Sequence, residues 1–304
     1  MKHLKTLRPP AGRTTQLLAL ARKLFIPFSL AFLAYSAYLA GGGIASLLAD
    51  VSWPHLLVAW LCWVTAQWIG PLTTAALARS MDVPLGYREL ALISILRLPA
   101  KYLPGGIWQS VARFSAYRGR DVGNESSVSI LVAEHVAALG TSMLLGGSIV
   151  LSLETAAITY RLAAITAIAG FALTIAPMLW IMLRRPRAAK AVGWVATGAA
   201  SMVTFWCLAA CAFLAYWFAV FGPGDIAIAT IVSCYLLSWA AGFVVLFAPQ
   251  GLGVFEWVAA QLLPATQPLS VIIVAVAGFR LVVIAGDLTA WLVGMVISRT
   301  RRDP

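Results

Sequence analysis

Long apolar stretches separated by short polar segments run through the whole chain. A helix needs about 20 apolar residues to cross a bilayer. Six stretches meet that length, at residues 24–43, 53–78, 125–151, 160–183, 192–221 and 270–298. The pattern therefore predicts an all-α polytopic membrane protein with six transmembrane helices.

Two further apolar segments, 85–118 and 226–264, are interrupted near their middle by proline and glycine. Proline lacks a backbone donor and glycine permits a sharp turn, so each segment is predicted to form a re-entrant helical hairpin. The alternatives are a helix on the cytoplasmic surface for the first segment and a full span followed by an interfacial loop for the second. The residues at the two breaks are Pro104, Gly105, Gly106, Pro249, Gly251 and Gly253.

The order of these elements repeats along the chain. Residues 24–155 read span, span, broken segment, span, and residues 156–298 repeat that order. Three full crossings in the first repeat place the start of the second on the opposite face, which predicts an inverted-topology repeat. Irregular backbone at membrane depth needs cover from protein or trapped water, so we expect the two hairpin tips to meet near the membrane middle.

Composition and charge support a membrane protein. The chain is 61% hydrophobic and 11% charged, whereas soluble domains carry about 25% charged residues. Of its 22 Lys and Arg, 20 lie in the tails 1–23 and 299–304 or in segments 79–120 and 184–190. By the positive-inside rule, both termini are predicted to be cytoplasmic. The net charge of +11 thus reflects topology, and nucleic acid is not expected as a partner.

The first span has an alternative interpretation. Small residues at 37–40 have the spacing of a signal-peptide cleavage site. A membrane span is favoured, because the basic region before it is long and because the span has a counterpart at 160–183.

Ionisable side chains inside apolar segments are candidates for function, since each costs at least ~2.5 kcal/mol at the membrane centre. Arg97 and Lys101 are four residues apart on one predicted helical face and could clamp a phosphate. The alternative is that both side chains snorkel to cytoplasmic headgroups. The full set is Arg97, Lys101, Arg113, Glu134, His135, Glu256, Arg280 and Asp287.

Some of these charges are expected to pair. Glu134 and Arg280 occupy equivalent depths in the two repeats, which predicts a structural ion pair between them, and Asp287 lies two turns beyond Arg280 on the same face. Glu256 has no partner nearby in the sequence, which favours substrate contact or proton coupling. His135 is predicted to be a packed, hydrogen-bonded residue.

Enzyme motifs are missing from the sequence. It contains no zinc-protease, nucleophile-elbow or phosphate-binding-loop motif, which excludes ATP-driven transport by this chain alone. Cys207 and Cys211 are interpreted as small core residues, and neither a metal nor a cofactor is expected. A membrane glycosyltransferase with Asp50 as acid or base stays open, as does a non-transporting subunit that presents a lipid-linked substrate to a glycan-assembly enzyme.

Two motifs resemble those of the lysylphosphatidylglycerol synthase/flippase transmembrane family. The run Lys-Tyr-Leu-Pro-Gly-Gly-Ile-Trp at 101–108, followed by Arg113, is similar to the first family signature. Glu134 falls where the family tends to place an acidic residue. The run Pro-Gln-Gly-Leu-Gly-Val-Phe-Glu at 249–256 is similar to the second signature, Pro-Gly-Gly-x-Gly-x-x-Glu, with Gln250 in place of the middle glycine.

The resemblance covers nearly the whole chain and implies a flippase-like protein of the bacterial or archaeal cytoplasmic (inner) membrane. It implies an anionic phospholipid or a polyprenyl-linked glycan carrier as substrate, with glycosyltransferases of the same pathway as possible partners. Polar groups of both hairpins would line the headgroup path. The soluble synthase domain of some members is not part of this sequence, so synthase activity is not expected.

Overall fold

The computed structural model describes residues 31, 34–35, 38–39, 50–103, 107–153, 157–183, 188–224, 226–245, 249–263 and 268–300. The described residues contain helices and no strands, which confirms the all-α prediction. Among the described residues, four helices are long and apolar enough to cross a membrane, which supports a multi-pass membrane protein. They are α3 (Trp53–Ser80), α6 (Asn124–Leu151), α8 (Ala188–Phe221) and α11 (Leu269–Arg299).

The remaining helices also follow the predicted order. Helix α7 (Ala157–Leu183) covers the residues predicted as a span at 160–183, and its described apolar part, Arg161–Ala176, is shorter than the four candidate spans. The first broken segment contains α4 (Tyr87–Ile95), η1 (Leu98–Tyr102) and α5 (Trp108–Arg118), and the second contains α9 (Ile228–Val244), η2 (Pro249–Gly251) and α10 (Val254–Leu262). Most of the predicted span 24–43 lies outside the described residues, as do Pro104, Gly105 and Gly106.

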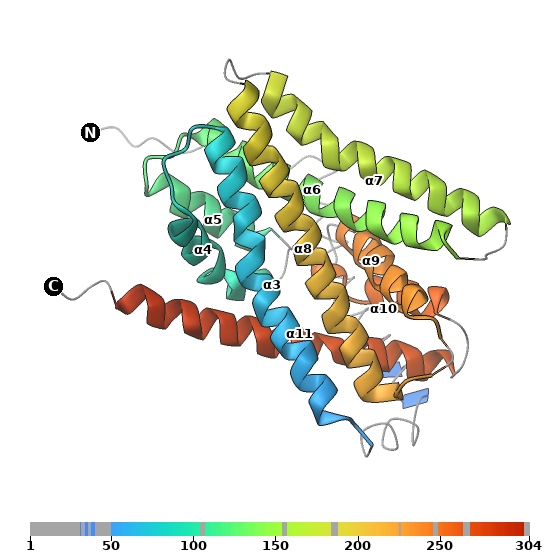
Figure 1. Ribbon diagram of the computed structural model, residues 1–304. Coiled ribbons are helices and arrows are strands. Elements are labelled where there is room, and N and C mark those ends of the chain that lie inside the picture. Colours follow the sequence, from blue (N-terminus) through green and yellow to red (C-terminus); the bar gives the residue numbers. More distant parts are fainter. Residues whose placement is uncertain are drawn as a thin grey trace, which may run out of the picture.

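Helices α3 and α8 lie side by side through the middle of the molecule and run antiparallel (Figure 1). At one end, the backbone N–H of Ser52 donates to the carbonyl of Ala219 at 2.9 Å. Toward the other end, the hydroxyls of Thr73 and Ser201 lie 2.8 Å apart. The second span of each predicted repeat therefore packs against its counterpart in the opposite direction.

The backbone of the second break is built from unusual conformations. Gln250, Gly251 and Gly253 have positive φ angles of 51°, 66° and 82°. A Cβ on Gly251 would lie 2.6 Å from the Cα of Gly242 in α9, so only glycine fits there. Helix α10 then starts with the carboxylate of Glu256 accepting from the N–H of Gly253 at 2.7 Å.

The two breaks touch each other. The side-chain amide of Gln250 in η2 donates to the carbonyl of Lys101 in η1 at 3.2 Å. This contact supports the expectation that the two broken segments meet, and it brings residues far apart in the sequence to one place.

An aromatic core packs the second half of the chain together. Trp206, Phe213, Tyr235, Phe255 and Phe279 are buried, and they come from α8, α9, α10 and α11. The ring of Phe213 lies 5.0 Å from that of Tyr235 and 5.2 Å from that of Phe279, measured between centroids. The ring of Phe255 in α10 also lies 6.3 Å from Phe213 and 6.0 Å from Tyr235, so the aromatic core holds α10 and α11 beside the second break.

Helices α6 and α7 approach closely because glycines face each other across their contact. A Cβ on Gly140 would lie 2.6 Å from the backbone nitrogen of Thr174, and one on Gly170 would lie 2.3 Å from that of Leu144. Small residues permit this close backbone approach between helices in lipid.

We therefore expect Gly170→Ala to lower the melting temperature of the purified protein in detergent, because α6 and α7 must move apart. Overpacking of this kind costs about 1–3 kcal/mol. Gly193→Ala in α8 is the matched control, since a Cβ there meets nothing within 4 Å. Equal melting temperatures for the two variants would contradict the close helix contact.

Candidate functional site

A cavity of about 440 Å³ lies where the two broken segments meet. Helices α3, α6, α8, α9 and α11 complete its wall. Aromatic rings supply much of the lining, and charged side chains gather at the two breaks. The charged residues and the histidine in the wall are Lys101, Arg113, Glu134, His135 and Arg280.

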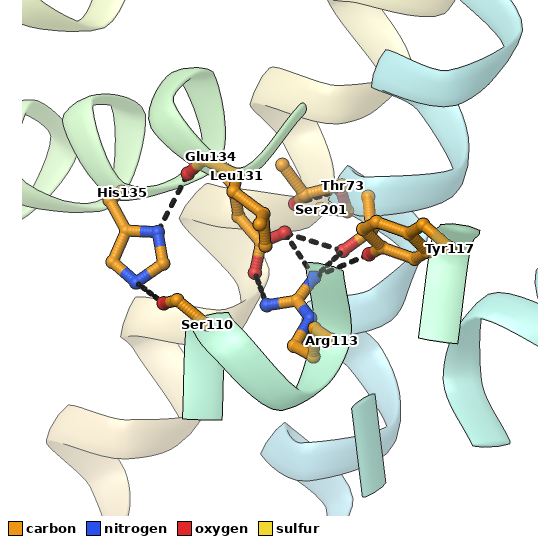
Figure 2. Close-up of polar contacts among 9 residues, drawn as sticks. Thr73, Ser110, Arg113, Tyr117, Leu131, Glu134, His135 and Ser201 are labelled. Carbon is orange, nitrogen blue, oxygen red and sulfur yellow. Dashed lines mark hydrogen bonds and ion pairs between the residues drawn. The ribbon is translucent and has the colours of Figure 1, made fainter. Parts of the chain in front are cut away.

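An ion pair between Arg113 of α5 and Glu134 of α6 forms one side of the cavity (Figure 2). The guanidinium donates to both carboxylate oxygens, at 2.9 and 2.6 Å. Thr74 donates a further hydrogen bond to the carboxylate at 2.8 Å, and the hydroxyl of Tyr117 accepts from Arg113 at 3.0 Å. Arg113 is buried, and such a bidentate geometry is what makes a buried pair favourable.

His135 lies next to this pair and is held by two hydrogen bonds (Figure 2). Its Nδ1 lies 2.7 Å from the carbonyl of Leu131, so Nδ1 carries the proton. Its Nε2 lies 3.4 Å from the hydroxyl of Ser110, and its ring stacks on Phe243. The prediction of a packed, hydrogen-bonded histidine is confirmed.

A second ion pair joins Arg280 of α11 to Glu256 of α10. The side chain of Glu256 is fully buried, whereas that of Arg280 is 23% exposed and lines the cavity. Arg280 also donates to the carbonyl of Gln250 at 3.3 Å. One carboxylate thus caps α10 through Gly253 and fixes a cation in the cavity wall.

The pair predicted between Glu134 and Arg280 is wrong, and Glu256 has a partner that the sequence did not reveal. Helix α6 packs on α5 and α11 packs on α10, so each charge meets a nearer opposite charge within its own half of the chain. Each half consequently contains one ion pair between the second helix of its broken segment and the helix that follows. The signs are exchanged: Arg113 faces Glu134, whereas Glu256 faces Arg280.

A third ion pair, between Lys101 and Asp287, connects the two halves. The side chain of Asp287 is 3% exposed and that of Lys101 is 17% exposed. Asp287 also accepts hydrogen bonds from the indole N–H of Trp63 at 3.0 Å and from the hydroxyl of Tyr102 at 2.5 Å. The first break is therefore tied to α3 and α11 through one buried carboxylate.

Arg97 does not join Lys101 in a common site. Helix α4 ends at Ile95 and a 3-10 turn containing Pro99 follows, so the two cations do not share one α-helical face. Arg97 donates to the carbonyls of Ala112 and Ile93, at 3.2 and 3.4 Å. It is not among the described residues that line the cavity. The predicted phosphate clamp of Arg97 with Lys101 is therefore not formed, because the helix breaks between them.

The glycines of the second break have separate roles. Gly251 lines the cavity, and the N–H of Gly253 is bound by Glu256. The side chain of Pro249 and all of Pro104, Gly105 and Gly106 lie outside the described side chains. Sequence reasoning missed Trp63, Tyr102 and Gln250. For Gln250 a signal existed, because a polar residue replaces a glycine at the tip.

No protein-family model and no curated protein matches this chain.

We expect Arg113→Gln and Glu134→Gln each to lower the free energy of unfolding by about 3–5 kcal/mol, because each leaves an unpaired buried charge. The double variant should recover much of the loss. The same should hold for Glu256→Gln and Arg280→Gln. Thermal or denaturant unfolding of the purified protein in detergent measures these values.

The matched control is the mixed double variant Glu134→Gln with Arg280→Gln, which removes one charge from each pair. Its two losses should add, since the two residues have different partners. Recovery of stability in the mixed variant would contradict the pairing. So would a lack of recovery in the double variants Arg113→Gln with Glu134→Gln and Glu256→Gln with Arg280→Gln.

Proposed function

We propose that this chain is a flippase-like membrane transporter that moves an anionic phospholipid or a lipid-linked glycan carrier between leaflets. The observation that carries the proposal is the cavity between the two broken segments, which presents the cations Lys101 and Arg280. A phosphate or phosphodiester headgroup needs such donors. A protein with several apolar membrane helices can keep acyl or prenyl chains in lipid while the headgroup enters the polar cavity.

The architecture that we propose is an inverted-topology repeat with six spans and two re-entrant hairpins. Three features support it: the antiparallel packing of α3 on α8, the contact between the two breaks, and one ion pair at the corresponding place in each half. Transporters of this type bind substrate between discontinuous helices near the membrane midplane. The similarity of residues 101–108 and 249–256 to the lysylphosphatidylglycerol synthase/flippase motifs agrees with this proposal.

Aromatic side chains complete the proposed binding site. Trp206, Trp239 and Phe243 line the cavity beside His135. The ring centroid of Trp239 lies 4.4 Å from that of Trp206 and 4.9 Å from that of Phe243. Aromatic faces bind the apolar faces of sugars or glycerol carbons while cations hold the phosphate. We place the protein in a bacterial or archaeal cytoplasmic membrane, with both termini in the cytoplasm.

Topology is tested by cysteine labelling in intact cells with a membrane-impermeant reagent. We expect single cysteines at Asp50, Thr159 and Gly224 to label from outside, and those at Gly119 and Ala188 to label only after lysis. The background should be a functional variant without Cys62, Cys207, Cys211 and Cys234. Outside labelling of Gly119 would make the first broken segment a full crossing and would refute the inverted repeat.

Transport is tested in liposomes that contain the purified protein and a fluorescent anionic phospholipid. We expect the protein to accelerate movement of this lipid between leaflets without changing it chemically. Lys101→Gln should slow the movement by about tenfold, since it removes one charge-assisted contact with the headgroup.

Asp50→Asn is the control for the glycosyltransferase alternative. Asp50 is exposed before α3 and is not among the described residues that line the cavity, so this variant should transport normally. A chemically altered lipid product that disappears with Asp50→Asn would refute transport as the primary activity. Normal transport by Lys101→Gln would remove Lys101 from the headgroup path.

A further inference from the structure

Two cations in the cavity wall, Lys101 and Arg280, are neutralised by carboxylates that lie behind them, whereas Arg113 pairs with Glu134 in the wall itself. Lys101 and Arg280 line the cavity, whereas their partners Asp287 and Glu256 do not and are buried. An anionic headgroup that reaches a cation must therefore share it with a resident carboxylate or displace that carboxylate. The strength of each ion pair sets how easily this exchange occurs.

The two ion pairs differ in how freely they can exchange. Glu256 is committed to the N-terminus of α10 through Gly253, and Arg280 is a guanidinium with further donors beyond the Nε that contacts Glu256. Arg280 can therefore keep Glu256 and still donate to a headgroup. The three N–H donors of Lys101 share one compact charge centre, so a headgroup that contacts this ammonium comes close to Asp287, repels its carboxylate and weakens the ion pair.

Asp287 is equipped to release Lys101. It keeps two other donors, the indole N–H of Trp63 and the hydroxyl of Tyr102. A buried carboxylate with two remaining hydrogen bonds is much less costly than one left without partners. The ammonium of Lys101 also lies 5.8 and 5.3 Å from the rings of Trp63 and Tyr102, which steady it by cation–π attraction.

Gln250 brings the two cations into one site. Its side chain donates to the carbonyl of Lys101, and its own carbonyl accepts from Arg280. Lys101 and Arg280 thus flank the same residue at the contact between the two breaks, and all three line the cavity.

We propose that Lys101 and Arg280 together bind the phosphate of one lipid headgroup, and that Asp287 is a resident counter-ion which this phosphate displaces from Lys101. The inference rests on the proposed function and adds that Asp287 competes with the headgroup phosphate for Lys101. It makes Asp287 a determinant of affinity although the carboxylate does not touch the headgroup. Removing this carboxylate should strengthen binding, which is opposite to the effect of removing either cation.

The experiment is a binding titration by calorimetry with the purified full-length protein in detergent. The probes are dioctanoyl phosphatidylglycerol, the uncharged dioctanoylglycerol and soluble glycerol 3-phosphate. We expect the anionic lipid to bind and the uncharged lipid to bind more weakly. Binding of glycerol 3-phosphate would show that phosphate alone occupies the site, and its failure would show that the lipid chains are also needed.

The variants make the test specific. Asp287→Asn, which keeps an oxygen for the Trp63 N–H, should tighten binding of the anionic lipid by about tenfold, and Lys101→Gln should weaken it by about tenfold. Tyr102→Phe should also weaken it, because Asp287 then depends more on Lys101. Tyr102 is not in the described cavity wall, so a merely structural role predicts no change for this variant. Arg97→Gln, the matched loss of a cation outside the wall, should bind as the unaltered protein does.

Two kinds of failure are distinguishable. If the unaltered protein does not bind the anionic lipid, both the proposed function and this inference are wrong. If it binds and Lys101→Gln weakens binding, but Asp287→Asn binds no more tightly, the counter-ion exchange alone is wrong. Should Asp287→Asn not purify, Tyr102→Phe decides, and unchanged affinity in that variant would overturn the exchange.

Discussion

The pairing of buried charge is the constraint on which this structure depends. A charge removed from water costs several kcal/mol unless an opposite charge and hydrogen bonds replace the solvent. Arg113, Glu256 and Asp287 are buried among helices, and each meets an opposite charge within the described part of the chain. Because these partners lie on different helices, the same contacts that neutralise the charges also fix how the helices are arranged.

Broken helices impose a related constraint. A break frees backbone donors and acceptors, which must be bound where water is scarce. Around the second break Glu256 binds the N–H of Gly253, Arg280 binds the carbonyl of Gln250, and the side chain of Gln250 binds the carbonyl of Lys101 at the first break. The two residues of the Glu256–Arg280 pair therefore neutralise each other's charge and also bind backbone groups that the break leaves free. This explains why an acidic residue stands just after the glycines.

The lengths of the apolar stretches were enough to predict the long helices that the structure describes, and proline with glycine was enough to predict the second break, at residues 249–253. In the first broken segment α4 already ends at Ile95, before the predicted tip. The partners of the charges could not be predicted in the same way. Glu134 and Arg280 are equivalent by position, yet Arg113 and Glu256 are nearer, because helix packing sets the distances and sequence order does not. The grouping of Arg97 with Lys101 assumed one continuous helix, and the turn at Pro99 separates them.

Trp63 and Tyr102 were missed for a different reason. An aromatic residue in a membrane protein is usually interpreted as packing or as an interfacial anchor. Its polar N–H or O–H becomes informative only when a buried acceptor is known to lie beside it. Asp287 supplies that acceptor here, and it belongs to a helix more than 180 residues away from Tyr102. No local pattern carries that information.

The exchanged signs of the two internal pairs separate what the halves share from what they do not. The contact between corresponding helices is stabilised by an ion pair in each half, Arg113 with Glu134 in the first and Glu256 with Arg280 in the second. The order of the charges along the chain therefore does not decide whether this contact forms. Asp287 follows Arg280 by seven residues, and the residue that follows Glu134 by seven is Thr141, whose buried hydroxyl has no partner among the described residues. The Lys101–Asp287 pair thus ties the first break to the second half of the chain. The equivalent position in the first half, Thr141, has no carboxylate that could tie the second break in the same way. In a transporter whose two states exchange the roles of the repeats, an unmatched pair of this kind makes the two states unequal in free energy. Under the proposed function, a headgroup that weakens the Lys101–Asp287 pair would reduce that difference and so couple occupancy of the site to the change of state.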